Sequence, residues 1–171
     1  TSYYKEVFCF PVKRFYERIG FDLKKESIET TSEEYMSSYR SHESQVSLST
    51  GASFVLDVIR QKGIKQYILS ACAQEDLMRI TNHFNLVDKF EKIYGADDIC
   101  AHGKIERGQM LIKNHSLNPQ RTLLIGDTLH DAEVAKALGI KSILYSGGHN
   151  SHNLLSKESR VISSLEEILT L

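Results

Sequence analysis

The stretch LLIGDTLHDAEVAKALGI, residues 123–140, predicts an apolar strand that leads directly into two carboxylates and then into a helix. Asp127 and Asp131 stand four residues apart at the point where the strand ends. Like charges in one turn repel each other unless a cation lies beside them. A divalent cation or a lysine would meet that need.

From residue 46 onward, short apolar runs alternate with helical patterns, which is typical of a parallel sheet with helices between its strands. We therefore expect a doubly wound, Rossmann-type α/β core over residues 46–171. The expected strands are 66–70, 92–95, 121–126, 141–145 and 160–162. The expected helices are 51–63, 73–84, 105–116, 130–139 and a last one that a capping box of Ser163 and Glu166 begins.

Residues 1–45 are rich in aromatic side chains and lack this alternation. The run TTSEEYMSSYRSH indicates a helix, with Thr31 and Glu34 as a capping box and Tyr35 and Tyr39 one turn apart. We interpret this part as a small, partial helical subdomain, separate from the core at 46–171.

The composition excludes several classes of protein. A net charge of -1 over 171 residues offers no basic surface for nucleic acid, and no apolar run approaches the length that spans a bilayer. We also expect no secretory signal. Cys9, Cys72 and Cys100 are odd in number and lack metal-ligand spacing, so reduced thiols in the cytoplasm are expected.

Three polar features follow strand ends, where open α/β sheets bind their ligands. Ser70 closes the apolar run QYIL, Lys104 comes shortly after KIYG, and Asp127 with Asp131 follows TLLI. Alone, the serine is typical of a turn and the lysine of a solvated surface. Together, in this order, the three features indicate a site.

That combination resembles the haloacid dehalogenase superfamily, in its phosphoglycolate-phosphatase-like branch. The family's second motif is an apolar strand ending in Ser or Thr, and YILS matches it. The third motif is a lysine, here Lys104. The fourth is an apolar strand followed by GD and a second Asp, and LLIGDTLHD matches it. Ala71 stands where the family often has Asn, and Ile105 where proline often follows the lysine. Residues 1–45 would then be the later part of a small helical cap.

The resemblance implies a Mg²⁺-dependent phosphatase that hydrolyses a small phosphorylated metabolite through an aspartyl-phosphate. Ser70 would hydrogen-bond the transferring phosphoryl group, and Lys104 would supply positive charge to it. Asp127 would bind Mg²⁺, and Asp131 would hold a metal-bound water or pair with Lys104. Ala71, Gly148 and His149 are candidates for loops that contact the substrate.

One departure from the family is serious. The first motif, DxDGT, carries the nucleophilic aspartate, and it is absent from these 171 residues. The segment FDLK at Asp22 lacks the second acid, and VFCFPV at 7–12 has neither acid. We therefore expect the nucleophile upstream of Thr1 and expect the 171 residues alone to be inactive. A binding or regulatory module that lost the nucleophile is the alternative; a response-regulator-like domain ranks below both, because its acidic pair follows the first strand.

In the family, the strand of the first motif lies in the middle of the sheet. Its absence would leave a gap of about two strand spacings, ~10 Å, between the strand ending at Ser70 and the one ending at Asp127. We expect an upstream segment to fill it, or alternatively the apolar run EVFCFPV at 6–12.

Two weaker features are assigned no chemistry. His149 and His152, with His130 nearby, have only loose zinc-ligand spacing, so surface histidines are favoured. Cys72 has no base placed to activate it and is interpreted as a half-buried bystander.

Overall fold

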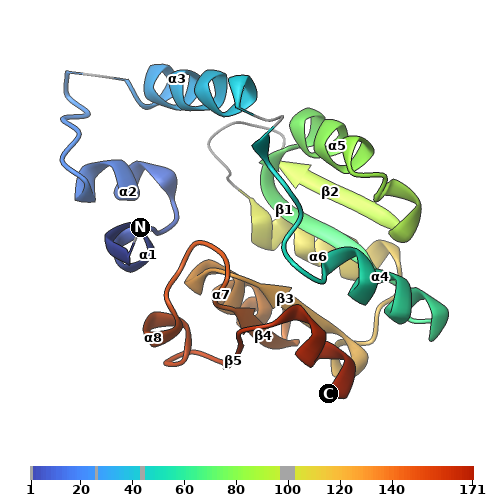
Figure 1. The fold of residues 1–171 in the computed structure, drawn as a ribbon. Coiled ribbons are helices and arrows are strands. Elements are labelled where there is room, and N and C mark those ends of the chain that lie inside the picture. The colour runs from blue at the N-terminus through green and yellow to red at the C-terminus, as the bar shows by residue number, and fades with distance from the viewer. Residues whose placement is uncertain (1, 26, 43–44, 97–102) are drawn as a thin grey trace.

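The structure is a computed structural model that describes residues 2–25, 27–42, 45–96 and 103–171. From residue 52 onward, helices alternate with strands, as predicted (Figure 1). The elements are, in chain order, α1 (Ser2–Val7), α2 (Val12–Arg18), α3 (Ile28–Ser41), α4 (Ala52–Gln61), β1 (Tyr67–Ala73), α5 (Gln74–His83), η2 (Val87–Lys89), β2 (Lys92–Ala96), α6 (Lys104–Asn114), η3 (Pro119–Arg121), β3 (Leu123–Gly126), α7 (Leu129–Leu138), β4 (Lys141–Tyr145), α8 (His152–Leu155), β5 (Arg160–Ile162) and η4 (Leu165–Thr170).

The strands form two parallel sheets. β1 pairs with β2, and β3, β4 and β5 form the second sheet in that order. The expected α/β class is confirmed, since every pairing is parallel and helices connect the strands. The best-buried side chains belong to the second sheet and its helices, with Val134, Leu144 and Leu155 each 0% exposed.

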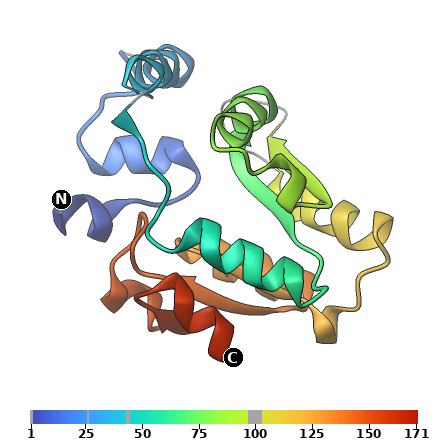
Figure 2. The ribbon, with the colours of Figure 1, turned by 45° about the vertical axis from the view of Figure 1, so that its right-hand side comes forward.

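β1 and β3 are not paired with each other, and within the described residues no strand lies between them. Helix α6 bridges the two sheets, because a Cβ atom on Gly108 would lie 2.7 Å from Leu138 of α7 and 3.2 Å from Leu69 of β1. In Figure 2, α4 lies between the two sheets, and it contacts both η2 and η4. Two helices therefore hold the sheets together where no strand does.

The strands beside this gap are more exposed than the strands beyond them. Leu123 and Ile125 of β3 are each 40% exposed, and none of the seven residues of β1 is fully buried. By contrast, β2 buries Ile93 and Ala96 although it lies at the outer edge. In a covered parallel sheet the middle strands should be the most buried. Among the described strands, β1 and β3 thus show the reverse of the burial that the two middle strands of one covered parallel sheet would have.

The alternative that EVFCFPV fills the gap is wrong. Its first residues form helix α1, and α2 begins at Val12. Both helices lie outside the two sheets (Figures 1 and 2). The two phenylalanine rings of this segment, Phe8 and Phe10, contact each other with their centroids 5.4 Å apart.

Helices α1 to α3 form the small helical cap that the resemblance implied. Helix α3 begins earlier than predicted, because Ser27 caps it by accepting the N–H of Thr30 at 3.1 Å. The expected capping box at Thr31 and Glu34 is therefore wrong. Arg40 near the end of α3 donates two hydrogen bonds to Asp76 of α5, at 3.2 and 3.0 Å, and so fastens the cap to the core.

Smaller boundary predictions also change. β1 extends to Ala73 rather than ending at residue 70. The last capping box lies one residue later than expected, at Ser164 and Glu167, and it begins the 3₁₀ helix η4. The boundary between cap and core at residue 45 stays a prediction. No helix among the described residues has the length and apolar character needed to span a membrane.

Candidate active site

A buried ion pair joins Lys104, the first residue of α6, to Asp131 in the first turn of α7. The Lys104 Nζ atom lies 2.6 Å from Asp131 Oδ1, and the two side chains are 11% and 6% exposed. Burial by itself raises the pKa of Asp131, but the charge and hydrogen bond of Lys104, with hydrogen bonds from Thr128, outweigh it and hold that pKa below its ordinary value. For one of the two acids, Asp131, the neighbouring cation is therefore a lysine.

The other oxygen of Asp131 shapes the turn between β3 and α7. Asp131 Oδ2 accepts the N–H of Asp127 at 3.1 Å and the N–H and hydroxyl of Thr128 at 3.0 and 2.7 Å. Thr128 is the N-cap of α7, and the two residues form a capping box. A Cβ atom on Gly126 would lie 2.2 Å from Asp131 Cγ, so only glycine fits there. These contacts explain why the run GDTLHD has its glycine, its threonine and its second aspartate at these positions.

Asp127 faces the loop after β4. Its Oδ2 atom accepts the N–H of His149 at 2.7 Å. A Cβ atom on Gly148 would lie 2.0 Å from the same oxygen, so the loop approaches this closely only because residue 148 is glycine. The structure therefore brings Gly148 and His149, two of the predicted loop residues, to the carboxylate of Asp127.

Ser70 lies within β1, in a part where the pairing with β2 is irregular between Leu69 and Ala73. Its hydroxyl accepts the N–H of Cys72 at 3.1 Å, and its carbonyl accepts a hydrogen bond from Arg107 at 3.3 Å. Arg107 lies one turn after Lys104 on α6, so this helix ties Ser70 to the lysine. Ala71 shares the irregular segment, and the roles of Ser70 and Ala71 stay predictions.

Sequence reasoning missed Asn150, which is 0% exposed. Its Oδ1 accepts the N–H of Leu129 at 3.0 Å, and its Nδ2 donates to the carbonyl of Phe8 at 2.9 Å. Its backbone N–H donates to the carbonyl of Asp127 at 3.1 Å. One amide thus joins the acidic loop to the cap. Its only sequence signal was a polar residue directly after GGH.

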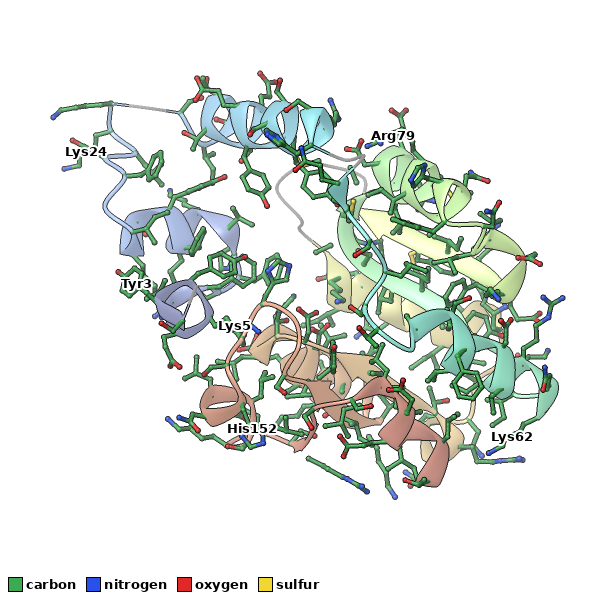
Figure 3. The ribbon with its side chains drawn as sticks, in the orientation of Figure 1. Tyr3, Lys5, Lys24, Lys62, Arg79 and His152 are labelled. Carbon is green, nitrogen blue, oxygen red and sulfur yellow. The ribbon has the colours of Figure 1, made fainter. Side chains whose placement is uncertain are left out.

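Aromatic side chains of the cap close over the same loop. The Phe8 and His149 rings stack with centroids 4.6 Å apart, and Tyr4 Oη lies 2.6 Å from His149 Nδ1. Burial, followed by the neighbouring Tyr35 and Asp127, raises the pKa of Tyr4 to about 12. Tyr4 therefore presents a neutral hydroxyl. Next to it, Lys5 points from α1 to the same loop and donates to the carbonyl of Ser146 at 3.0 Å (Figure 3).

The histidines take separate partners. His130 on α7 lies 3.0 Å from Glu133, His149 packs against the cap, and His152 begins α8. Across the part of the chain that the structure describes, no group of three or more His, Cys, Asp or Glu side chains could hold a metal ion. The described residues thus do not bring together the three or four side chains that a zinc ion takes from a protein.

Magnesium makes smaller demands on the protein, since it is usually held by one or two carboxylates together with waters and substrate phosphates. Asp127 fits that role: within the described residues its side-chain hydrogen bonds involve Oδ2, which leaves Oδ1 for a cation. Both oxygens of Asp131 are already engaged. Asp131 fits better as a group that orients the lysine and the turn than as a direct ligand.

Comparison with known proteins identifies a family that this chain matches. A family model described as haloacid dehalogenase-like hydrolase matches residues 1–145. The tyrosine-protein kinase PtkA of Mycobacterium tuberculosis is 26% identical over 117 residues, which are 68% of this chain and 40% of the relative. The chain thus spans about 40% of the length of the curated relatives it matches.

Solved structures share the fold. PtkA of Mycobacterium tuberculosis superposes with a TM-score of 0.79 at 21% identity, covering 99% of this chain and 80% of that one. A protein described as a predicted phosphatase from Clostridium acetobutylicum gives 0.75 at 18% identity, with 94% and 77% covered. A haloacid dehalogenase-like family hydrolase from Streptococcus pneumoniae gives 0.70 at 20% identity, with 91% and 79% covered. They confirm a Rossmann-type core with a small helical cap.

Proposed function

Because the chain belongs to the haloacid dehalogenase-like hydrolase family, we propose that the complete protein is a Mg²⁺-dependent phosphatase of a small phosphate monoester. An aspartate upstream of Thr1 attacks phosphorus, a bond forms between its carboxylate oxygen and phosphorus, and the ester oxygen leaves with the alcohol. Water then hydrolyses the aspartyl-phosphate and releases inorganic phosphate.

The observation that carries this proposal is the buried pair of Lys104 and Asp131 directly beside Asp127. A lysine that is held by a buried carboxylate keeps a fixed position at the carboxyl end of β3. A preorganised cation of this kind stabilises the charge that develops on a transferring phosphoryl group. An ordinary turn after a strand would not need a buried lysine.

Each residue has a defined task in the proposed reaction. Ser70 donates its hydroxyl to a phosphoryl oxygen, and Lys104 balances the negative charge of that group. Asp127 holds Mg²⁺, which when bound would neutralise further phosphoryl charge. Asp131 keeps Lys104 and the turn at Asp127 in position. Gly148 and His149 border the place where the substrate enters.

The missing strand supports an upstream nucleophile. The exposed side chains of β3 and the unpaired edges of β1 and β3 call for a parallel strand between them. The carboxyl end of such a strand would lie between Ser70 and Asp127, where a nucleophile has to be. We propose that the upstream segment supplies both the strand and the aspartate, and that the 171 residues alone do not turn over substrate.

The alternative is a binding or regulatory module that kept the fold without the nucleophile. The absence of DxDGT from the 171 residues favours it. The reading frame upstream of Thr1 separates the two proposals, because DxDGT there supports the enzyme. Some relatives are named tyrosine-protein kinases, so the assay should score transfer of phosphate to protein as well as its release.

The first experiment measures hydrolysis of p-nitrophenyl phosphate by the complete protein. We expect activity to require Mg²⁺ and to collapse in Asp127→Asn, because loss of a charged ligand weakens the site of a hard cation. Asp88→Asn is the matched control, since that side chain is 74% exposed and pairs with Arg60. Full activity in EDTA would rule out the proposed metal dependence.

The second experiment tests Lys104. We expect Lys104→Met to lower kcat by at least about a hundredfold, the effect of removing one electrostatic stabiliser. Lys113→Met, in the last turn of the same helix, should leave kcat near its original value. Equal kcat values for the two variants would show that Lys104 has no part in catalysis.

The proposal also covers the substrate class, the partners and the location of the protein. The substrate is a small phosphorylated metabolite, and neither nucleic acid nor a membrane is a partner. The near-zero net charge supports this choice. Cys9 and Cys72 are unpaired thiols, which suits a reducing cytoplasm.

A further inference from the structure

Asn150 combines complete burial with hydrogen bonds from both ends of its amide. The residue is 0% exposed. Its Nδ2 donates to the carbonyls of Phe8 and Lys5 at 2.9 and 3.3 Å, and its Oδ1 accepts the N–H of Leu129 at 3.0 Å. A buried polar atom without a partner costs free energy, so this place needs a side chain that both donates and accepts. An aspartate of the same size would accept but could not donate.

Asn150 helps to fix the turn after β3, where Asp127 lies. Asp131 accepts the N–H of Asp127 at 3.1 Å. Asn150 supplies two further bonds, since its N–H donates to the carbonyl of Asp127 at 3.1 Å and its Oδ1 holds the N–H of Leu129. The neighbouring N–H of His149 donates to Asp127 Oδ2 at 2.7 Å. Asp127 is thus held at its backbone and at one of its carboxylate oxygens.

The loop that carries Asn150 is itself anchored to the end of α1. The carbonyl of Lys5 accepts hydrogen bonds from the Asn150 side chain and from the N–H of Ser151, at 3.3 and 3.2 Å. The last carbonyls of a helix have no partner inside it and accept from outside. Lys5 in turn donates from Nζ to the carbonyl of Ser146 at 3.0 Å (Figure 3). The loop is therefore fastened to α1 at both of its ends.

We propose that Asn150 is a positioning residue of the metal site, whose amide holds the turn after β3 in the form in which Asp127 binds a divalent cation tightly. The inference rests on the proposed function, in which Asp127 holds Mg²⁺. Residues that hydrogen-bond to a metal ligand without touching the metal commonly change its affinity by about 10- to 100-fold when they are replaced. Asn150 acts on the ligand through the carbonyl of Asp127 and through the adjoining N–H of His149.

The test measures binding of Mn²⁺, a paramagnetic substitute for Mg²⁺, to the complete protein by electron paramagnetic resonance. Asn150→Asp keeps the size of the side chain and its acceptor but removes the NH₂ group that reaches Lys5 and Phe8. We expect the dissociation constant for Mn²⁺ to rise at least about tenfold. The added negative charge would by itself tighten binding of a cation, so a weaker affinity reports a change of geometry. Asn153→Asp, the same change at an exposed residue of α8, should not weaken binding.

A second control separates positioning from general stability. Thr81 on α5 is 3% exposed, and its hydroxyl donates to the carbonyl of Leu77 at 2.8 Å. Thr81→Val removes this buried hydrogen bond, so it should lower the Tm while the affinity for Mn²⁺ stays as in wild type. If Thr81→Val weakens Mn²⁺ binding as much as Asn150→Asp does at a similar Tm, the loss follows stability and the positioning role is overturned.

A measurement on the wild-type protein covers the case in which Asn150→Asp does not fold. In ¹⁵N NMR spectra of the complete protein, added Mg²⁺ should shift the side-chain amide signal of Asn150 and leave that of Asn153 in place. An unshifted Asn150 signal would overturn the inference.

The results also distinguish this inference from the proposed function. Mg²⁺-dependent hydrolysis together with unchanged Mn²⁺ affinity in Asn150→Asp would keep the phosphatase and overturn the positioning role. Weaker Mn²⁺ binding in Asn150→Asp, with no hydrolysis by the wild-type protein, would keep the positioning role and favour the non-catalytic alternative. A wild-type protein that binds no Mn²⁺ would overturn both.

Discussion

At the scale of single residues, Asp131 does the most for the site because each of its oxygens has a separate task. One oxygen holds Lys104, and the other accepts three hydrogen bonds that close the turn after β3. The sequence left two roles open for this acid, a metal-bound water or a pair with Lys104, and the structure shows the pair. The sequence could not predict Asn150, whose partner Phe8 lies 142 residues away along the chain.

The depressed pKa of Asp131 leads to a prediction about stability. In Asp131→Asn, Lys104 is left buried without its carboxylate, so we expect the free energy of unfolding at pH 7 to fall by about 3 kcal/mol. The folded pKa lies below the unfolded value of about 3.9, so the wild-type carboxylate stabilises the fold above that pH and loses this effect as the pH falls through the folded pKa.

Urea unfolding of the complete protein at pH 7 and in steps down to pH 3 measures this difference. The gap between wild type and Asp131→Asn should be widest above about pH 4 and should narrow below it. Asp88→Asn, whose side chain is 74% exposed, should stay within about 0.5 kcal/mol of wild type. A gap of constant size across the range would mean that the lost ion pair is not its cause.

At the scale of elements, the sequence predicted strands best where apolar runs were bounded by clear turn residues. β4 and β5 begin and end where expected, and Gly139 ends α7 in a left-handed conformation, with φ 66°. Helix α3 was harder, because Ser27 and Thr31 both offer a capping side chain and local chemistry alone does not choose between them. The strand-like composition of EVFCFPV was misleading, because Glu6 and Val7 end helix α1 and the segment forms no strand.

The ion pair between α3 and α5 should control how firmly the cap is held. Asp76 is only 5% exposed and accepts hydrogen bonds from both Arg40 and Arg79. In Arg40→Ala, Asp76 keeps Arg79, so the core should stay folded while α3 loses its attachment. We expect faster amide hydrogen exchange across α3 and little change in α5, measured by mass spectrometry on the complete protein.

Arg60→Ala provides the comparison for that variant. Arg60 pairs with Asp88, and both of these side chains are more than half exposed. An exposed pair contributes little to stability, so exchange in α3 should stay as in wild type. If Arg40→Ala also leaves exchange in α3 unchanged, other contacts hold the cap.

At the scale of the whole molecule, the two separate sheets explain features that no single element explains. β3 has apolar side chains that remain partly exposed, and within the described residues it has no strand partner on the side away from β4. Unpaired backbone groups and exposed apolar strand residues both cost free energy. The sequence predicted this gap only through the resemblance to a family, because nothing in the residues themselves records a strand that they lack.

The last prediction follows from the pairing of each strand. Among the strands that the structure describes, β4 has partners on both sides, whereas β1 and β3 have one each. If an upstream strand fills the gap, amides in β1 and β3 should exchange at least roughly tenfold more slowly in the complete protein than in the 171-residue chain, while β4 changes less. β4 is thus an internal control for overall stability.

Equal slowing of all three strands would mean that the upstream segment stabilises the fold from outside the sheet, and equal exchange in both proteins would mean that the gap stays open. In either case the nucleophile could not reach its proposed position between Ser70 and Asp127, and the non-catalytic module would become the better account of this chain.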